Sequence, residues 1–179
     1  MRELSLNVMD IVQNSIAAKA TLIEIAERTA GNSLVITIKD NGSGMTGEQL
    51  ESVTNPFFTT RTTRDVGLGV PLFKMACEQT GGSFSIESEK DAGTLVTARF
   101  VTGHIDMTPI GNMDETILLL ITCNPDIDFV YENKVNGRGF ALDTRELREV
   151  LGGDVPLSSP DVAEWIRGYL KEQQDEISS

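Results

Sequence analysis

The sequence has little of three things that would direct a functional assignment: histidine, cysteine and long apolar runs. One histidine and two cysteines among 179 residues, with no C-x-x-C motif, argue against a zinc site or a disulfide framework. We expect Cys77 and Cys123 to be small core residues, and His104, which has no catalytic partner nearby in the sequence, to be structural or solvent-facing. No apolar run approaches the roughly 20 residues that a helix needs to cross a bilayer, and the N-terminus lacks a signal-peptide pattern. The sequence therefore predicts a cytoplasmic protein without a membrane segment.

Positive charge is also scarce. The sequence has 15 lysine and arginine residues against 27 aspartate and glutamate residues, for a formal net charge of −12. Nonspecific binding of nucleic acid or of an anionic membrane requires a basic face, so we expect neither partner. Residues 103–179 alone hold 6 basic and 15 acidic residues. This acidic part either keeps the protein soluble or docks a basic partner protein.

The length and composition are those of a globular protein, with 40% hydrophobic and 23% charged residues. A chain of this size suits one domain, or one domain with a small extension. Residues 1–102 have a net charge of −3 and residues 103–179 a net charge of −9, and we predict a first domain over residues 1–102. Residues 103–179 are then an acidic α+β extension.

The stretch 40–47, with the sequence DNGSGMTG, is the first part of the chain in which glycines and small side chains cluster. It follows an alternating run over 34–39 that is typical of a strand, and its glycines permit positive φ and close backbone approach. We interpret it as a ligand loop in which Asp40 accepts hydrogen bonds. Gly42, Gly44 and Gly47 also satisfy G-x-G-x-x-G, but a dinucleotide-binding fold needs a continuously apolar strand before them and a long helix after them. The alternating strand and the short helix expected over 48–53 argue against that fold.

A polar ridge lies on the helix predicted over residues 4–20. Its apolar residues fall at helical spacing, while Asn7, Asp10 and Asn14 lie three and four positions apart and therefore stack on one face. Few charged residues border this face, and buried polar side chains need partners. We interpret the ridge as part of a site rather than as a solvated helix surface.

Hairpins alternate with helices over the first 101 residues. Strands are predicted over 21–30, 34–39, 83–89 and 93–101, and a second long helix from Gly67 to about Thr80. The threonine-rich stretch 54–65 is interpreted as a mobile lid. Glycines at the start of the helix that follows leave free N–H groups, which suit phosphate. This order predicts an α+β fold, a two-layer sandwich with helices on one face of a mainly antiparallel sheet.

Four separated motifs together resemble the GHKL ATPases, the superfamily that includes the ATP-binding domains of type II topoisomerases, MutL, chaperones and sensor histidine kinases. Residues 10–21 resemble the N box and 40–45 the G1 box. Residues 56–61 with 67–69 are similar to the F and G2 boxes, and Gly93 with Thr94 resembles the last glycine-threonine motif. The resemblance covers about residues 4–101 and implies the Bergerat ATP-binding fold.

The resemblance also implies roles for individual residues. Asp40 would accept from the exocyclic amine of adenine with support from Thr94, Asn14 would hold Mg²⁺ through its amide oxygen, and Asp10 would be the catalytic base. The residues that it places around ATP are Asn14, Ala17, Asp40, Gly42, Gly44, Met45, Phe58, Thr59, Thr60, Arg61, Arg64, Gly67, Leu68, Gly69, Val70 and Thr94. Gly42 and Gly44 would meet the base and ribose, Gly67 to Gly69 would cradle phosphates, and Arg61 and Arg64 would reach the terminal phosphate from the lid.

This sequence departs from the family pattern at two places. Asp10 stands where hydrolytic relatives place a glutamate, and aspartate is one methylene shorter. Asp65 and Val66 precede Gly67 where sensor kinases usually have glycine, and a carboxylate near phosphates repels them. The first departure bears on hydrolysis and the second on closure of the lid.

Residues 103–179 lie outside the resemblance and contain no motif that indicates a chemical function. The apolar run 117–121 suits either a buried strand or a helix; acids after Asn112 favour a helix that ends near Pro125. A hairpin over 127–142 with its turn at Asn136 and Gly137, and two further helices, complete a small α+β unit.

The sequence thus supports two hypotheses about function. In the first, the chain is a Mg²⁺-ATP-binding protein whose lid closes on ATP, whose slow hydrolysis resets it, and whose acidic extension engages a partner protein. In the second, it is a protein kinase acting in trans, like an anti-sigma-type serine kinase or the catalytic subunit of a split histidine kinase. Only nine residues precede Asp10, which leaves no room here for a phosphoacceptor helix pair, so we expect a stand-alone unit rather than a complete sensor kinase.

Overall fold

The computed structural model describes residues 3–54 and 68–178, which form six helices and six strands. In chain order the elements are α1 (Leu4–Ala17), β1 (Leu22–Ala30), β2 (Ser33–Asp40), α2 (Gly47–Thr54), α3 (Gly69–Glu78), β3 (Ser83–Glu89), β4 (Gly93–Val101), α4 (Met113–Cys123), β5 (Asp128–Val135), β6 (Arg138–Asp143), α5 (Thr144–Leu151) and α6 (Pro160–Ser178). None of the helices in these ranges is both long and apolar enough to cross a bilayer.

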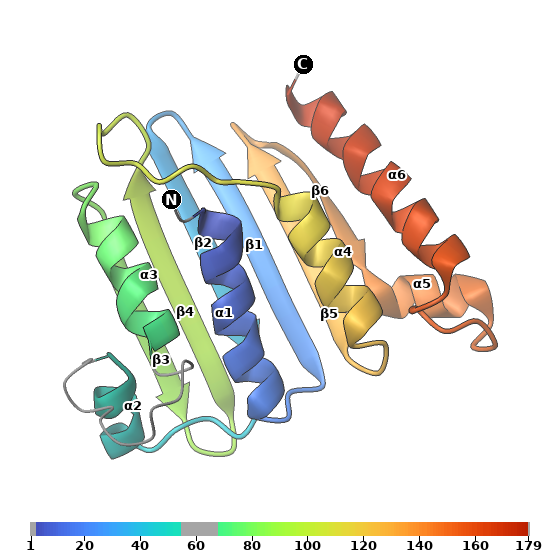
Figure 1. The fold of residues 1–179 in the computed structure, drawn as a ribbon, viewed down its shortest axis with the longest axis horizontal. Helices are drawn as coiled ribbons and strands as arrows, with labels where there is room; N and C mark the ends of the chain where they lie inside the picture. The colour runs from blue at the N-terminus through green and yellow to red at the C-terminus, as the bar shows by residue number, and fades with distance from the viewer. Residues whose placement is uncertain (1–2, 55–67, 179) are drawn as a thin grey trace.

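One six-stranded sheet runs through the whole molecule in the order β3-β4-β2-β1-β5-β6 (Figure 1). β1 pairs with β5 in parallel, and every other neighbouring pair is antiparallel. β2 is antiparallel to both of its neighbours, and the helix that follows the glycine loop has only 8 residues. The dinucleotide-binding fold is therefore excluded.

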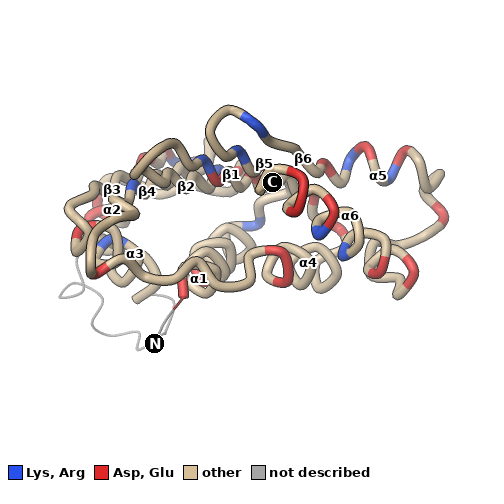
Figure 2. The backbone as a smooth tube through the Cα atoms, turned by 90° about the horizontal axis from the view of Figure 1, so that it is seen from above, with Lys and Arg blue, Asp and Glu red and all other residues tan. Residues whose placement is uncertain are grey.

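The helices α1, α3, α4 and α6 lie on one face of this sheet (Figure 1). Figure 2 shows the strands as one layer and α3, α1 and α4 as the other. The predicted α+β, two-layer sandwich is confirmed. Burial explains it, because β2 alternates strictly and buries Leu34, Ile36 and Ile38 on the face that the helices cover.

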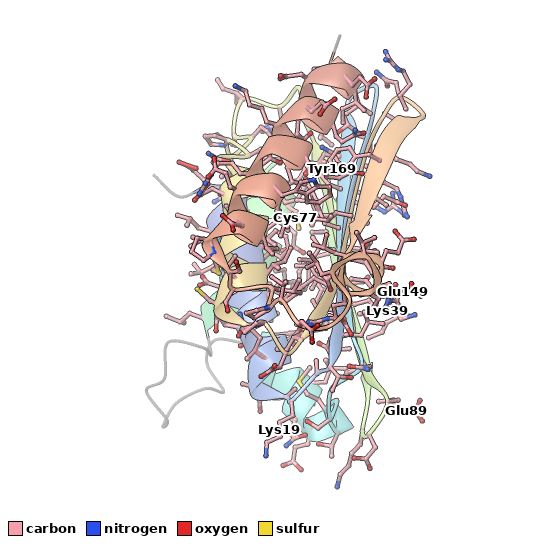
Figure 3. The ribbon with its side chains drawn as sticks, turned by 90° about the vertical axis from the view of Figure 1, so that its right-hand side faces the viewer. Lys19, Lys39, Cys77, Glu89, Glu149 and Tyr169 are labelled. Carbon is pink, nitrogen blue, oxygen red and sulfur yellow. The ribbon has the colours of Figure 1, made fainter. Side chains whose placement is uncertain are left out.

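A single hydrophobic core lies between the two layers. It includes Phe73 and Phe100 from the first part of the chain and Tyr131 and Phe140 from the last part. Cys77 lies within it, between the helices and the sheet (Figure 3), and burial raises the pKa of its thiol to about 11. The prediction that both cysteines are core residues is wrong for Cys123, which is exposed at the end of α4.

The apolar run 117–121 is part of the helix α4, as the acids after Asn112 favoured. The Asn112 side chain accepts a hydrogen bond from the Glu115 backbone N–H at 3.0 Å and caps the helix. The hairpin turn that follows is also where it was predicted, since Asn136 and Gly137 both have positive φ. His104 is solvent-facing, and its Nδ1 accepts from the backbone N–H of Asp106 at 3.0 Å.

Residues 103–179 complete the same sheet and the same core rather than standing apart from them. A buried polar network ties the two parts together: the Tyr131 hydroxyl donates to Glu27 at 2.9 Å, and the Gln174 amide donates to Asp114 at 2.7 Å and to the Tyr131 hydroxyl at 3.2 Å. These four side chains come from β5, β1, α6 and α4. The division at residue 102 stays a prediction about folding units.

Candidate functional site

A cavity of about 360 Å³ lies between α1 and the end of the sheet where β2 stops. Six of the residues predicted to surround a ligand line it: Asn14, Asp40, Gly44, Met45, Val70 and Thr94. The other lining residues are Ile11, Ser15, Ala18, Ile38, Val53, Ile86 and Val96, most of them apolar. An apolar cavity with a few fixed polar groups is the usual form of a small-molecule site. A second cavity, about 560 Å³, lies between α5 and α6 and contains none of the predicted residues.

The polar centre of the cavity is Asp40, whose side chain is buried at the last position of β2. Its Oδ2 accepts from the Ser15 hydroxyl at 2.6 Å, and its Oδ1 accepts from the Gly42 backbone N–H at 2.8 Å. These two donors fix the orientation of the carboxylate. A carboxylate has about four acceptor positions, so this one can still accept a hydrogen bond from a ligand in the cavity.

Ser15 is a functional candidate that the sequence analysis missed. It lies one residue after Asn14 and four after the buried Ile11, on the side of α1 that faces the sheet. A serine at that spacing is a buried hydroxyl in need of an acceptor. The sequence could therefore have indicated that Ser15 needs an acceptor. It could not have identified that acceptor as Asp40, which lies 25 positions away.

Thr94 faces Asp40 directly across the β2–β4 ladder. Its hydroxyl lies 2.8 Å from that of Ser88, which in turn accepts from the Met45 backbone N–H at 2.9 Å and donates to the Gly93 carbonyl at 3.0 Å. Ser88 thereby joins the glycine loop to the β3–β4 hairpin. It is a second polar residue that the sequence motifs did not indicate.

The glycine loop is held against this chain's own backbone. At Gly44, where φ is +67°, an added Cβ would overlap the carbonyl oxygen of Glu89. At Gly42 it would lie 2.8 Å from the carbonyl oxygen of Ala18. The Ser43 backbone N–H donates to that Ala18 oxygen at 2.9 Å. The close approach that the glycines permit is therefore to α1 and the β3–β4 turn, and their contact with a base and ribose stays a prediction.

The amino end of α3 packs against α1 beside Asp10. An added Cβ at Gly69 would lie 3.3 Å from the Asp10 Cβ, so the half-buried carboxylate stands next to the helix start predicted to bind phosphate. Val70 lines the cavity, while Leu68 is exposed at the helix start. On α1, Asn7 is buried and Asp10 and Asn14 are half-buried, which fits the predicted polar ridge.

Some predicted ligand residues lie elsewhere. Ala17 is exposed, and its neighbour Ala18 lines the cavity instead. The lid residues Phe58, Thr59, Thr60, Arg61 and Arg64, together with Gly67, are outside the described residues. Among the residues that are described, no three histidine, cysteine or acidic side chains gather in a way that could hold a metal ion. Asn14 and Asp10 lie one helical turn apart on α1 and carry oxygen atoms of the kind that a hard cation prefers.

Comparison with known proteins gives one family. The model described as histidine kinase-, DNA gyrase B- and HSP90-like ATPase matches residues 1–103. Sporulation kinase C of Bacillus subtilis is 32% identical over 89 residues, which are 49% of this chain and 21% of that protein. Sensor histidine kinase ZraS of Klebsiella oxytoca is 36% identical over 77 residues, 42% of this chain and 16% of that protein. The chain therefore spans about a fifth or less of these relatives.

A solved structure extends the likeness to the fold. The MutL ATPase domain of Aquifex aeolicus, solved in complex with ADP, superposes with a TM-score of 0.53 over 85% of this chain and 70% of that one, at 19% identity. At this identity the likeness concerns the fold alone.

Proposed function

Because the chain belongs to the family of histidine kinase-, DNA gyrase B- and HSP90-like ATPases, we propose that it binds ATP in the cavity between α1 and the sheet, and that ATP occupancy regulates a partner protein. The observation that carries the proposal is the buried Asp40 carboxylate, held by Ser15 and Gly42 at the wall of an otherwise apolar cavity. An acceptor fixed in such a place selects a ligand with an amine donor on a flat apolar body, which describes adenine.

The remaining cavity residues suit the rest of the nucleotide. Thr94, opposite Asp40, supports the contact with the base, and the apolar side chains of Ile38 and Ile86 pack on its faces. Backbone N–H groups at the start of α3 donate hydrogen bonds to the negatively charged phosphates. In this proposal the base lies deep between α1 and the sheet, and the phosphates lie toward Asp10 and Gly69.

Asn14 and Asp10 fit a magnesium ion by their chemistry, since both offer oxygen ligands of the kind that a hard cation prefers. In the proposal Asn14 holds Mg²⁺ through its amide oxygen. When bound, the ion would neutralise part of the negative charge of the ATP phosphates.

Asp10 is the proposed general base for slow hydrolysis. Its carboxylate takes a proton from water, the water oxygen attacks the γ-phosphorus, and the bond to the bridging oxygen of ADP breaks, which gives ADP and phosphate. Hydrolysis then resets the nucleotide state. The lid over residues 54–65 is proposed to close on ATP, and the protein to act in the cytoplasm, where ATP is abundant.

Phosphoryl transfer to a protein is a second candidate function, favoured by the names of the matched relatives, which are sensor and sporulation kinases. In this case a side chain of another protein replaces water as the nucleophile. The same cavity serves both reactions.

Incubation of the purified protein with γ-labelled ATP, alone and with a cell lysate, separates the two. Hydrolysis predicts labelled free phosphate from the protein alone, lost in Asp10→Asn and kept in the control Asp91→Asn, which changes an exposed carboxylate in the β3–β4 turn. Label on a lysate protein instead, absent when Asp40→Asn replaces the wild type, selects phosphotransfer. Neither product from a protein that binds ATP would contradict both reactions.

A further inference from the structure

The second cavity forms a groove on the surface of residues 103–179, at the edge of the sheet farthest from the ATP cavity. This α5–α6 groove has a volume of about 560 Å³ and lies between β6, α5 and α6. Its lining residues are Ala141, Leu142, Asp143, Glu146, Leu147, Val150, Leu151, Val155, Asp161, Val162, Trp165 and Tyr169. Nine of these twelve are apolar or aromatic, so the groove offers apolar surface to water.

Three of the lining side chains are large, apolar and exposed. Val150 is 83% exposed, Trp165 51% and Val155 39%. Trp165 stacks on Tyr169 with ring centroids 5.1 Å apart and planes 10° apart. Tyr169 lies between α6 and the sheet (Figure 3) and donates to the Ala141 carbonyl at 3.3 Å. Single exposed apolar residues are ordinary, but a cluster of them around a hollow marks an interaction site.

The rim of the groove carries acids that the described residues leave without an ion pair. Glu146 and Asp161 line it, while the third lining acid, Asp143, pairs with Arg145 at 2.8 Å. Arg148 pairs with Asp128, outside the groove, at 2.7 Å. Figure 2 shows acidic and basic positions together on α5 and further acidic positions along α6. Burial and the Glu146 charge raise the pKa of Tyr169, so this carboxylate acts on the aromatic floor of the groove.

We propose that the α5–α6 groove binds a segment of a partner protein that presents apolar side chains beside lysine or arginine. The apolar side chains cover Val150 and Val155, and the cations meet Glu146 and Asp161. An arginine or lysine also suits the faces of the Trp165 and Tyr169 rings. The inference deepens the partner regulation in the proposed function by naming where the partner binds and by what chemistry.

Charge argues against a second copy of this chain as the occupant. Residues 103–179 hold 6 basic and 15 acidic residues. A symmetric contact would place Glu146 and Asp161 of one copy against the same acids of the other, and like charges across an interface are unfavourable.

The groove can be observed directly, because Trp165 is the only tryptophan of the chain. Two synthetic peptides without tryptophan serve as probes, with one amphipathic helical pattern of leucines and with either lysine or glutamate at every polar position. They are titrated into the 179-residue protein without nucleotide. The proposal predicts a saturable change in Trp165 emission with the leucine–lysine peptide, weakened by salt, and none with the leucine–glutamate peptide.

Variants assign the binding to the groove. Val150→Asp changes an exposed side chain and should weaken binding of the leucine–lysine peptide about tenfold or more, the effect of roughly 1.4 kcal/mol. Ile105→Asp, at a position 93% exposed outside the groove, is the matched control and should leave it unchanged. Glu146→Lys combined with Asp161→Lys should shift the preference toward the leucine–glutamate peptide.

Equal binding of the leucine–lysine peptide to wild type and Val150→Asp would overturn the proposal, as would equal binding of both peptides or of neither. Self-association of the wild type that Val150→Asp abolishes would assign the groove to a second copy and overturn it as well. Since no nucleotide is present, a failure of ATP binding leaves these outcomes unaffected.

Discussion

At the scale of single residues, the account depends on the pair formed by Ser15 and Asp40. Their hydrogen bond, 2.6 Å long and buried, joins α1 to the end of β2. A carboxylate held by two donors keeps one orientation, and binding to a fixed acceptor avoids the entropy of ordering it. Ser15 is thus expected to act on the nucleotide through Asp40 as a positioning residue.

Removing the Ser15 hydroxyl tests this. Ser15→Ala leaves Asp40 with one donor, and we expect ATP affinity to fall roughly two- to tenfold, since a buried hydrogen bond contributes about 0.5–1.5 kcal/mol. Calorimetric titration with ATP measures it. Ser83→Ala, on the exposed side of the edge strand β3, is the control. Unchanged affinity in Ser15→Ala would show that the hydroxyl has no part in the site.

At the scale of elements, the glycine loop contains one position where a side chain has no room and another where it has ample room. Gly44 has positive φ and no room for a Cβ beside Glu89, whereas Gly47, at the start of α2, has nothing within 4 Å of that position. Gly44→Ala should cost about 2 kcal/mol or more of unfolding free energy. Gly47→Ala should be neutral or stabilising by up to about 1 kcal/mol. Denaturant unfolding of both variants checks the pair, and equal stabilities would refute the assignment of strain to Gly44.

The buried polar network between β1, β5, α4 and α6 makes stability depend on pH. Burial raises the pKa of Glu27, with a smaller contribution from Asp114, whose own pKa burial also raises. A raised pKa in the folded state means that the ionised carboxylate is a cost, fully present above the folded pKa and absent below the unfolded value. Stability should therefore rise as the pH falls from neutral toward about 4.3, the ordinary glutamate value.

Glu27→Gln removes this cost and keeps an oxygen that can accept from the Tyr131 hydroxyl. We expect the variant to be more stable than wild type at neutral pH, by on the order of 1 kcal/mol for one buried group, and its stability to vary less with pH. Thermal unfolding across this pH range measures both. Glu87→Gln, exposed on β3, is the control. Arg145 lowers the pKa of Asp143, so this carboxylate has the opposite effect: its contribution to stability is lost as the pH falls below this range.

Individual elements were largely predictable because their signals are local. The 83–89 and 93–101 strands, the Asn136–Gly137 turn and the Asn112 cap follow from alternation, turn chemistry and capping within a few residues. The exposure of Cys123 was missed because it depends on where α4 ends relative to its neighbours. Ser15 was missed because its partner Asp40 lies 25 positions away, and Ser88 because its link to the glycine loop is a bond to Met45, 43 positions away.

At the scale of the whole molecule, the sequence predicted two layers but not one continuous sheet. The parallel pairing of β1 with β5 joins residues about 105 positions apart, such as Ile25 and Tyr131, and no local pattern specifies such a partner. As a result, the cavity beneath α1 and the α5–α6 groove lie on one sheet and share one core, so the two proposed binding sites belong to one packed unit.

The central claim is that Asp40 selects adenine in the cavity beneath α1. Calorimetric titration of ATP and GTP with Mg²⁺ into the wild type and Asp40→Asn tests it most directly. Guanine carries an oxygen where adenine has its amine, so an acceptor such as Asp40 should favour ATP strongly. We predict one-site binding of ATP, little binding of GTP, and a loss of ATP affinity of at least about tenfold in Asp40→Asn, or roughly 1.4 kcal/mol. Equal ATP affinity in the two proteins, or no ATP binding by the wild type, would contradict the account.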